Sequence, residues 1–527
     1  MNDADRAAYL AALSPGTNID HRGTPFTTEL LDQLLDALHD PTTDTPRIGV
    51  AQFSEASFSG TAWFKQASFS GGARFDEASF SGPAEFDGAS FSGTAEFSGT
   101  SFSDQAGFDE ASFSSIARFD EASFSSTAQF SWASFSSTAQ FGGAHFEGAS
   151  HLGPLVCDER VILDGAVFQQ PVTVEIAARQ VSCARTRWVS TATLQLRYAE
   201  LDLRDAIFEY PVLVAARPTP FPLPAGIPAS AHAGLLLFEA ELSGLEPGVR
   251  LSTIGGVDAA HLALHDIDLS RCRFAGAVHL DQLRVDGWCA FATTPTGWSR
   301  RLPWRWSRRT TLTEEHHWRV RAARRPDRAT ALGWAGPQQD APDLKPAAVA
   351  ALYRQLRKSL EDGKNEPDAA DFYYGECEMR RHDTARPRGE RALLTVYWAL
   401  SGYGLRATRA LAWLGAAMAV TVAVMMLWGL PVDDPEPTLT GRQVSVGQQV
   451  VLTTDTPDPV NPTGPLTRRV TTERFEKSLR VVINSVAFRS SGQDLTTAGT
   501  YTEMTSRLAE PVLLGLAVLA VRGRVKR

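Results

Sequence analysis

The sequence predicts a mainly β fold: a solenoid of short strands, followed by an α-helical hairpin and by transmembrane helices toward the C-terminal end. Three observations predict it. Phenylalanine recurs every five or six residues from Phe53 to Phe146, two amphipathic stretches follow within residues 347–381, and the 21 residues from Ala410 to Leu430 contain no charged side chain. A chain of 527 residues is long enough for about three domains.

Residues 1–45 are predicted to form an N-terminal helical cap. Leucines at helical spacing make one apolar stripe that ends before Pro41. We expect this helix to cover the first coil of the solenoid, and a contact between two copies of the chain is the alternative. The stripe consists of Leu30, Leu31, Leu34, Leu35 and Leu38.

Residues 46–150 are predicted to form the regular solenoid. The steps between phenylalanines alternate strictly between five and six residues, and alanine stands two residues before each phenylalanine except Phe102, where Thr100 replaces it. A helix repeats its buried face every 3.6 residues and a strand every two. The chain must therefore turn a corner in every unit and bury the two apolar side chains on a central axis. The predicted core includes Phe58, Phe69, Phe80, Phe91, Phe102, Phe113, Phe124 and Phe135.

The units Ala56–Gly60 and Ala89–Gly93 both read Ala-Ser-Phe-Ser-Gly. They resemble the pentapeptide-repeat family in its phenylalanine-rich form. The resemblance implies a right-handed, four-sided β-helix in which four units make one coil. The repeats would then form four to five coils, about 20 Å long at about 4.8 Å between stacked strands. Such an array is a scaffold rather than a catalytic device.

Residues 151–290 are predicted to continue the solenoid with degenerate repeats. The small-x-large unit recurs at Ala166–Phe168 and Ala206–Phe208, and large apolar residues return every five or six positions from Leu264 to Leu280. A stretch rich in proline and alanine, about 217–233, is expected to loop out of the coil because proline cannot donate to a strand ladder.

Residues 291–346 form a linker rich in arginine and tryptophan. Ten arginines lie between Trp298 and Arg328. Arginine and tryptophan favour the membrane interface, so anionic lipid headgroups are the expected contact; the chain's own acidic coils and nucleic acid are alternatives. The adjacent His316 and His317 would point in different directions, so no metal site is expected there. The candidate lipid or phosphate contacts are Arg300, Arg301, Arg308, Arg309, Arg324 and Arg325.

Residues 347–409 are predicted to form a juxtamembrane helical hairpin with helices over 347–362 and 368–381. The segments Tyr353–Lys358 and Glu378–Arg381 resemble the hairpin that accompanies pentapeptide repeats in bacterial membrane proteins. Its acidic residues face lysine and arginine at helical spacing, so they are interpreted as a salt-linked surface rather than as general acids.

Residues 410–527 are predicted to be the membrane region. Residues 410–430 have the length of a transmembrane helix, and a second span over about 505–521 would need residues upstream of its apolar run. Seven arginines lie between 380 and 409, and the last six residues carry four more basic side chains. By the positive-inside rule, both termini and the solenoid are expected in the cytoplasm, on a multi-pass protein of the cell inner membrane.

The stretch between the two spans weakly resembles the pore domain of a two-transmembrane ion channel. An amphipathic helix over 475–488 is followed by a loop with the residues of a degenerate selectivity filter, Thr496, Thr497, Gly499 and Tyr501. Such a filter needs successive backbone carbonyls aimed at the ion, with glycine allowing the unusual backbone angles.

The sequence indicates a non-catalytic protein without a cofactor. It contains no Gly-rich phosphate loop, G-x-S-x-G elbow or H-E-x-x-H motif, and its five cysteines are too scattered for a zinc ribbon or a disulfide framework. We expect a membrane-anchored scaffold whose partners are the lipid bilayer and proteins that the sequence does not identify. One alternative is a partner- or ligand-gated, tetrameric ion channel.

A second alternative is a DNA-mimicking modulator of a topoisomerase, since some soluble relatives with such repeats imitate duplex DNA. Eleven acidic residues against three basic ones between Ala51 and Phe146 would permit this role. A tether to the membrane argues against it, and nucleic acid is not expected as a partner.

Overall fold

In the computed structural model the chain forms two compact units, Met1–Tyr373 and Tyr374–Arg527. The structure describes residues 3–525 apart from 223–241, 243, 245–246, 296–307, 339, 432–435, 442–446, 448–451 and 456.

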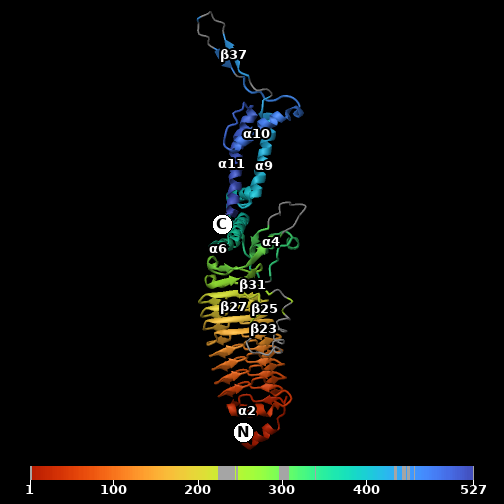
Figure 1. The fold of residues 1–527 in the computed structure, drawn as a ribbon, viewed down its shortest axis with the longest axis vertical. Coiled ribbons are helices and arrows are strands. Elements are labelled where there is room, and N and C mark those ends of the chain that lie inside the picture. Colours follow the sequence, from red (N-terminus) through yellow and green to blue (C-terminus); the bar gives the residue numbers. More distant parts are fainter. Residues whose placement is uncertain are drawn as a thin grey trace. The chain divides into compact units, whose positions relative to one another are not determined.

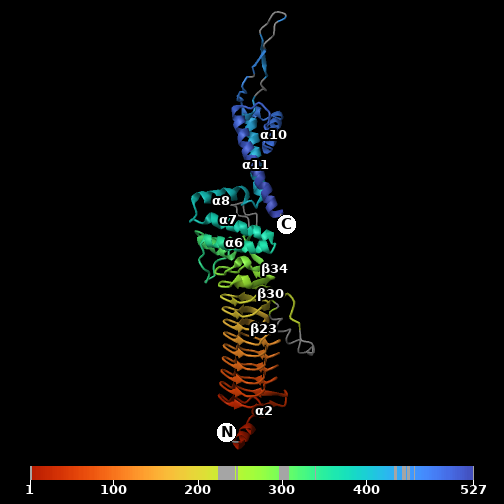
Figure 2. The ribbon, with the colours of Figure 1, turned by 90° about the vertical axis from the view of Figure 1, so that its left-hand side faces the viewer.

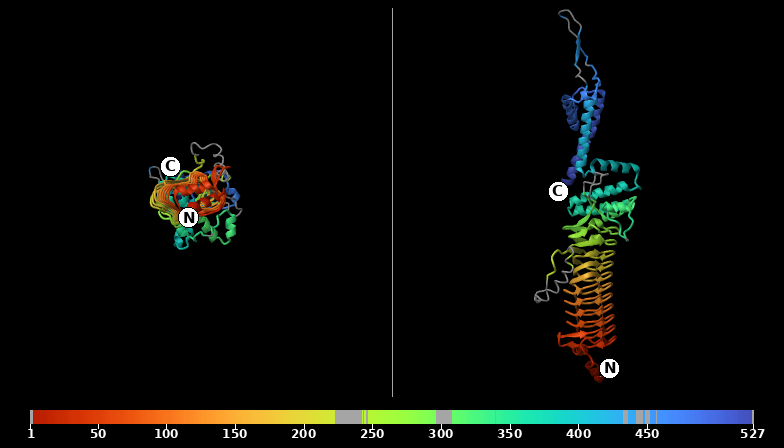
Figure 3. Two further views of the ribbon diagram at one scale, coloured as in Figure 1. Left: turned by 90° about the horizontal axis from the view of Figure 1, so that it is seen from below. Right: turned by 90° about the vertical axis from the view of Figure 1, so that its right-hand side faces the viewer.

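The first unit is a solenoid of stacked four-sided coils, which confirms the predicted fold class (Figures 1 and 2). One coil contains β6 (Ser57–Phe58), β7 (Ala62–Trp63), β8 (Ser68–Phe69) and β9 (Ala73–Arg74), after which β10 (Ser79–Phe80) pairs with β6 in parallel. Seen from below, the coils lie over one another (Figure 3, left). Two steps of five residues and two of six therefore complete one coil.

The same four sides continue through the regular repeats. Their other strands are β5 (Ala51–Gln52), β11 (Ala84–Glu85), β12 (Ser90–Phe91), β13 (Ala95–Glu96), β14 (Ser101–Phe102), β15 (Ala106–Gly107), β16 (Ser112–Phe113), β17 (Ala117–Arg118), β18 (Ser123–Phe124), β19 (Ala128–Gln129), β20 (Ser134–Phe135), β21 (Ala139–Gln140) and β22 (His145–Phe146).

The phenylalanines form four columns inside these coils. Rings directly above one another are nearly parallel, as for Phe58 and Phe80, whose centroids are 4.5 Å apart. Rings of different columns meet either edge to face, an arrangement that aromatic pairs favour, as for Phe86 and Phe97, or at a tilt, as for Phe75 and Phe80. Thr100, the exception to the alanine rule, is buried, and its hydroxyl donates to the carbonyl of Phe75 at 2.7 Å. All eight predicted core phenylalanines are buried.

The solenoid continues beyond the regular repeats with shorter coils. Phe146 lies 22 residues after its partner Phe124, whereas Phe168, Trp188 and Phe208 follow one another at intervals of 20. The predicted loop 217–233 lies outside the described residues from 223 onward, and the next strand after the gap, β31, pairs with β28. The strands and 3-10 turns are β23 (His151–Ile162), β24 (Val167–Phe168), β25 (Val172–Ser182), β26 (Arg187–Trp188), β27 (Ala192–Arg197), β28 (Glu200–Asp202), β29 (Ile207–Phe208), β30 (Val212–Ala216), β31 (Val249–Thr253), η1 (Ala259–His261), β32 (Leu262–His265), β33 (Ile267–Leu269), η2 (Leu280–Gln282), β34 (Arg284–Asp286) and β35 (Ala290–Thr293).

A helix replaces a strand at the N-terminal end of the solenoid. After the short helix α1 (Asp3–Ala11), the strands β1 (Ile19–Asp20) and β2 (Pro25–Phe26) pair with β5 and β6. The helix α2 (Thr28–Ala37) then packs beside β7 and buries Leu31, Leu34 and Leu35. It occupies one side of the first coil, and β3 (His39–Asp40) and β4 (Thr45–Ile48) complete that coil, because β4 pairs with β8.

Helices close the other end of the solenoid. The strand β36 (Thr310–Thr311) pairs with β35, and α4 (Thr313–Ala322) and α5 (Pro326–Ala331) follow. The two helices of the predicted hairpin are α6 (Pro346–Asp362) and α7 (Glu366–His382). Helix α6 lies over the last coil (Figure 2), where the hydroxyl of Ser359 donates to the carbonyl of Leu283 at 2.5 Å.

The second unit contains two long apolar helices. After α8 (Arg388–Ser401), α9 (Ala407–Val424) runs into a π-helical turn, η3 (Met425–Gly429), and packs beside α11 (Thr497–Val525) (Figure 1). The stretches Ala407–Gly429 and Thr497–Arg522 are long and apolar enough to cross a membrane, by length and composition. The remaining elements are β37 (Thr438–Gly441), β38 (Leu452–Asp455), η4 (Leu466–Arg469) and α10 (Thr472–Val486).

Helix α10 is tied to the end of α9. The guanidinium of Arg474 donates to the carbonyls of Met426, Leu430 and Pro431 at 2.7–3.0 Å. These carbonyls lie at the C-terminal end of η3, where the helix itself offers no partner. The short amphipathic helix is therefore held against the last turn of the first apolar helix.

Candidate interaction surface and the polar cluster that closes the solenoid

Exposed glutamates form a row along one corner of the solenoid. Glu55, Glu77 and Glu121 occupy the same place in their coils, and Gly99 takes that place in the coil between the last two. All four residues have φ between 56° and 66°, a left-handed conformation that favours glycine. The corner geometry therefore does not require a glutamate, and the three carboxylates are presented to solvent. We call this row the glutamate ladder.

The aspartates at neighbouring corner positions have a structural role instead. The carboxylate of Asp109 accepts from the backbone N–H of Ser131 at 2.6 Å, and that of Asp120 accepts from Gly142 at 2.9 Å. Each bond joins one coil to the next. Partial burial raises the pKa of both carboxyl groups. The acidic excess of the sequence therefore divides into partly buried corner links and exposed side chains.

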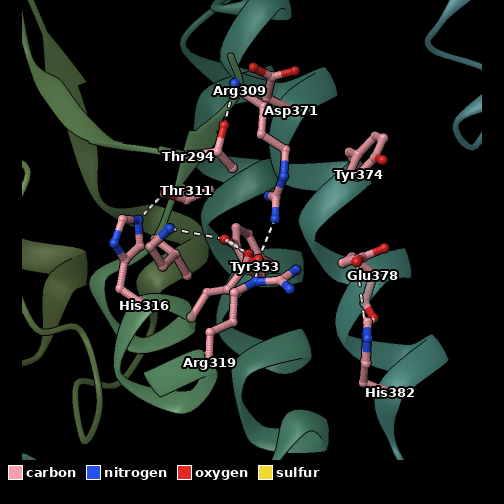
Figure 4. Close-up of polar contacts among 12 residues, drawn as sticks. Thr294, Arg309, Thr311, His316, Arg319, Tyr353, Asp371, Tyr374, Glu378 and His382 are labelled. Carbon is pink, nitrogen blue, oxygen red and sulfur yellow. Dashed lines mark hydrogen bonds and ion pairs between the residues drawn. The ribbon is translucent and has the colours of Figure 1, made fainter. Parts of the chain in front are cut away.

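A buried ionic cluster fills the space between the last coil and helix α6 (Figure 4). Its centre is Glu315 on α4, which has no exposed side-chain surface and contacts the guanidinium of Arg309. Arg319 donates to the same carboxylate at 2.7 Å, and the hydroxyl of Tyr353 also donates to this carboxylate, at 2.5 Å. Burial alone would raise the pKa of Glu315, but the two arginines and the Tyr353 hydroxyl outweigh burial and hold it well below its usual range.

The preceding residue, Glu314, caps the open edge of the solenoid. Its Oε1 atom accepts from the backbone N–H groups of Phe274 at 2.5 Å and Ala275 at 3.0 Å. Both donors follow the bridge residue Arg273, in the segment between β33 and η2. Because Glu314 is buried, its pKa is raised. Glu314 therefore binds α4 to the solenoid, whereas the next residue, Glu315, binds α4 to helix α6.

Two histidines of α4 complete this region in neutral form. The Nδ1 atom of His316 accepts from the backbone N–H of Ala335 at 3.2 Å, and its Nε2 atom lies 2.9 Å from the hydroxyl of Thr311. A proton on Nδ1 would remove the first bond. Burial lowers the pKa of His316 and of His317 to about 4. Among the described residues no group of three or more His, Cys, Asp or Glu side chains could hold a metal ion.

The structure corrects one of the arginine predictions. Arg309 is only 4% exposed because its side chain pairs with Glu315, so it is not available to a lipid headgroup or to a nucleic-acid phosphate. Arg308, Arg324 and Arg325 lie on the surface. Arg300 and Arg301 lie outside the described residues.

The predicted filter loop is wrong, because its residues begin a helix. Thr496 caps α11, with its hydroxyl accepting from the N–H of Gly499 at 3.2 Å. Thr497, Gly499 and Tyr501 lie in the first turns of α11, where helical carbonyls point along the axis rather than toward an ion. A side chain at Gly499 would meet the carbonyl oxygen of Gly429 at 2.2 Å. Glycine here allows close contact between two helices.

Some acidic residues of the hairpin form the predicted surface pairs, such as Glu361 with Arg357 at 3.4 Å, but others are not on the surface. Glu376 and Glu378 are buried. The carboxylate of Glu378 accepts from Arg381 at 2.8 Å and from the hydroxyl of Tyr403 at 3.0 Å. These ion pairs therefore belong to the interior of the second unit.

The sequence reasoning missed the buried cluster at Glu315. Its one local signal is the spacing of four residues between Glu315 and Arg319, which places opposite charges on one helix face. Tyr353 gives no local signal of its polar role, because its partner Glu315 lies on a different helix. The polar partners of the cluster are up to 38 residues apart.

The comparisons identify the repeats. The sequence model of the pentapeptide-repeat family, described as nine copies of the repeat, matches residues 48–90 and 108–153. The matched residues are those of the phenylalanine-lined coils, so this part of the chain consists of pentapeptide repeats. A search of curated proteins finds no match, and neither does a search of solved structures.

Proposed function

We propose that this protein is a membrane-anchored, non-catalytic scaffold whose solenoid binds other proteins on the cytoplasmic side of the inner membrane. The observation that carries the proposal is the glutamate ladder on a rigid core. Three exposed carboxylates repeat along one corner in register with the stacked coils, which lie about 4.8 Å apart. A partner with basic side chains at matching spacing would meet all three without ordering any flexible segment.

The columns of phenylalanine support the rigidity that a scaffold needs. Phe97 lies 4.9 Å from Phe75 below it and 4.9 Å from Phe119 above it, with nearly parallel rings. Each ring is fixed by its neighbours along and across the stack. Side chains on the outside therefore keep their spacing.

The two apolar helices support the anchor. Six arginines between positions 380 and 406 precede the first of them, Arg409 lies in its first turn, and Arg522 and Arg524 stand at the end of the second. Positive residues are retained on the cytoplasmic side. This distribution favours a hairpin with both flanks in the cytoplasm, on the side where the solenoid would bind its partners.

The experiment is crosslinking of the full-length chain in intact cells, followed by mass spectrometry of its neighbours. The wild type is compared with a ladder variant, Glu55→Lys, Glu77→Lys and Glu121→Lys, in which the row of carboxylates becomes basic. A control variant carries the same change of charge at Asp327, Asp340 and Asp362, which are exposed and lie outside the repeats.

We expect neighbours that are crosslinked to the wild type and the control but are lost from the ladder variant. Carbonate extraction of the same cells should leave all three proteins in the membrane pellet. An unchanged set of neighbours in the ladder variant would reject the ladder as the binding surface. Release of the wild type into the carbonate supernatant would reject the anchor.

A further inference from the structure

Helix α8 has an apolar side that the described residues leave exposed. Leu393 is 69% exposed and Val396 is 54% exposed, and both lie on one side of the helix with Leu400. The side that carries Trp398 contacts α7, since the indole N–H of Trp398 donates to the hydroxyl of Tyr374 at 3.0 Å.

The surroundings of this helix are strongly basic. Between Arg386 and Arg409 there are five arginines and a single acidic residue, Glu390. That carboxylate is already paired, with Arg386 at 2.6 Å and Arg380 at 3.0 Å. Arg388 is exposed at the start of α8. An apolar side next to the exposed Arg388, in a segment with a net positive charge, suits a surface that is both apolar and anionic.

The bend between α8 and the first apolar helix is held by several contacts. The ring of Trp398 has the guanidinium of Arg381 at 4.7 Å and that of Arg409 at 5.1 Å. Arg409 also donates to the carbonyl of Trp398 at 3.1 Å, and the indole of Trp413 on α9 donates to the carbonyl of Ala399 at 3.1 Å. Helix α8 therefore lies across the direction of α9, as Figure 2 shows, and five residues separate their ends.

We propose that α8 lies in the interfacial layer of the membrane and binds anionic phospholipid through Leu393 and Val396 among the acyl chains and Arg388 at the phosphates. This inference rests on the proposed membrane anchor. If α9 spans the bilayer, the fixed bend places α8 at its cytoplasmic boundary, parallel to the surface. Amphipathic helices with basic residues at the rim bind there, and binding grows with buried apolar area and with the anionic lipid content.

Lipid is a better match than protein for this surface because the same contacts that hold α8 also join it to the apolar helix. A protein partner or a second copy of the chain would have to reach a surface beside the bilayer. The excess of arginine also favours phosphate, which accepts bidentate bonds from guanidinium.

The test uses the full-length protein in nanodiscs of zwitterionic lipid with or without anionic phospholipid. Spin labels are placed in separate variants, Leu393→Cys and Val396→Cys, on a background in which the partly exposed Cys289 is replaced by serine. Thr395→Cys is the matched control, because Thr395 is also exposed but lies on another side of the same helix. Val420→Cys reports on α9, where Val420 is 61% exposed.

We expect labels at 393 and 396 to be more accessible to dissolved oxygen than to a water-soluble nickel complex, with the reverse at 395. The difference should increase in the anionic nanodiscs. Equal accessibility to nickel at 393 and 395 would overturn the inference, as would short label-to-label distances between copies at 393. A label at 420 that reports lipid while 393 reports water would reject only the role of α8. Water at 420 would reject the anchor itself.

Discussion

The hydroxyl of Tyr353 joins two segments at the closed end of the solenoid. It donates to the carboxylate of Glu315 at 2.5 Å and accepts from the backbone N–H of Leu312 at 2.9 Å. Tyr353 lies on α6, which covers the last coil, and Glu315 lies on α4. One phenolic oxygen therefore satisfies a buried charge and a buried backbone donor together.

Tyr353→Phe should loosen this end of the solenoid. The substitution keeps the ring but leaves one oxygen of Glu315 and the N–H of Leu312 without this partner, and each buried unsatisfied group costs about 1–3 kcal/mol. Hydrogen exchange of residues 308–322 and 346–362, measured by mass spectrometry, should accelerate by at least tenfold. Tyr210→Phe, in which an exposed hydroxyl is removed, is the control and should change nothing.

Acidification should destabilise the same region before it affects the repeats. The folded pKa of His316 and of His317 is about 4, below the value of about 6.5 expected in the unfolded chain. Above pH 6.5 both states are neutral, whereas between pH 6.5 and 4 only the unfolded state binds these protons. The unfolding free energy therefore falls as pH falls, by about 2 kcal/mol for His316 at pH 5.

The check is hydrogen exchange of residues 308–338 at pH 7 and pH 5, corrected for the intrinsic rates. His316→Asn keeps an acceptor near the Nδ1 position but does not titrate, so its exchange should depend less on pH. A wild-type segment that is equally protected at both pH values would contradict the neutral, buried state of the histidines.

The coils could be predicted from the sequence because their information is local. A Phe at every fifth or sixth position and an Ala two residues earlier define the sides, the corners and the buried core of each coil without any distant contact. The one exception, Thr100, is accommodated by a hydrogen bond to Phe75. The change from 22 to 20 residues per coil can also be read from the sequence, because Phe168 and Phe208 are 40 residues apart and enclose two coils. The replacement of a strand by α2 could not be predicted, because a leucine stripe does not specify which side of the coil the helix occupies.

The closing cluster could not be predicted, because its charges neutralise one another across long stretches of sequence. Arg309 resembled its exposed neighbour Arg308 in every local respect, and only the position of Glu315 separates them. The filter prediction failed for a different reason. A Thr-Thr-x-Gly sequence can supply carbonyls to an ion, but it can equally cap a helix through Thr496 and allow close packing through Gly499.

Phe97→Ala should destabilise the solenoid by about 3–5 kcal/mol. The ring is fully buried and stacks 4.9 Å from Phe75 and from Phe119, so its loss leaves a cavity that neighbouring rings cannot fill without leaving their own stacks. Urea unfolding of the full-length protein followed by far-ultraviolet circular dichroism measures the effect. Ile207→Ala, at an exposed position, is the control and should shift the midpoint little.

Glu77→Gly should stabilise the repeats by about 1 kcal/mol, because φ at this corner is 56° and the left-handed conformation costs an L-residue about that amount. Gly99→Ala, at the same corner one coil later, should destabilise by a similar amount. The nearest atom to the added carbon would be Cγ of Glu77 at 3.5 Å, so no clash contributes. Urea midpoints of the two variants should therefore move in opposite directions, and a shift of both in one direction would contradict the conformational explanation.

Gly499→Ala should separate the two apolar helices, whereas Gly515→Ala in the same helix should not. A methyl group at 499 would lie 2.2 Å from the carbonyl oxygen of Gly429, which belongs to backbone and cannot rotate away, whereas nothing lies within 4 Å of one at 515. The bond from the N–H of Thr496 to that same carbonyl, 3.0 Å long, would be lost when the helices move apart. Both variants gain the higher helix propensity of alanine, about 1 kcal/mol, so the difference between them isolates the contact. We expect a lower temperature of unfolding in detergent for Gly499→Ala and an unchanged or higher one for Gly515→Ala. Equal behaviour of the two would mean that the helices do not meet at these glycines.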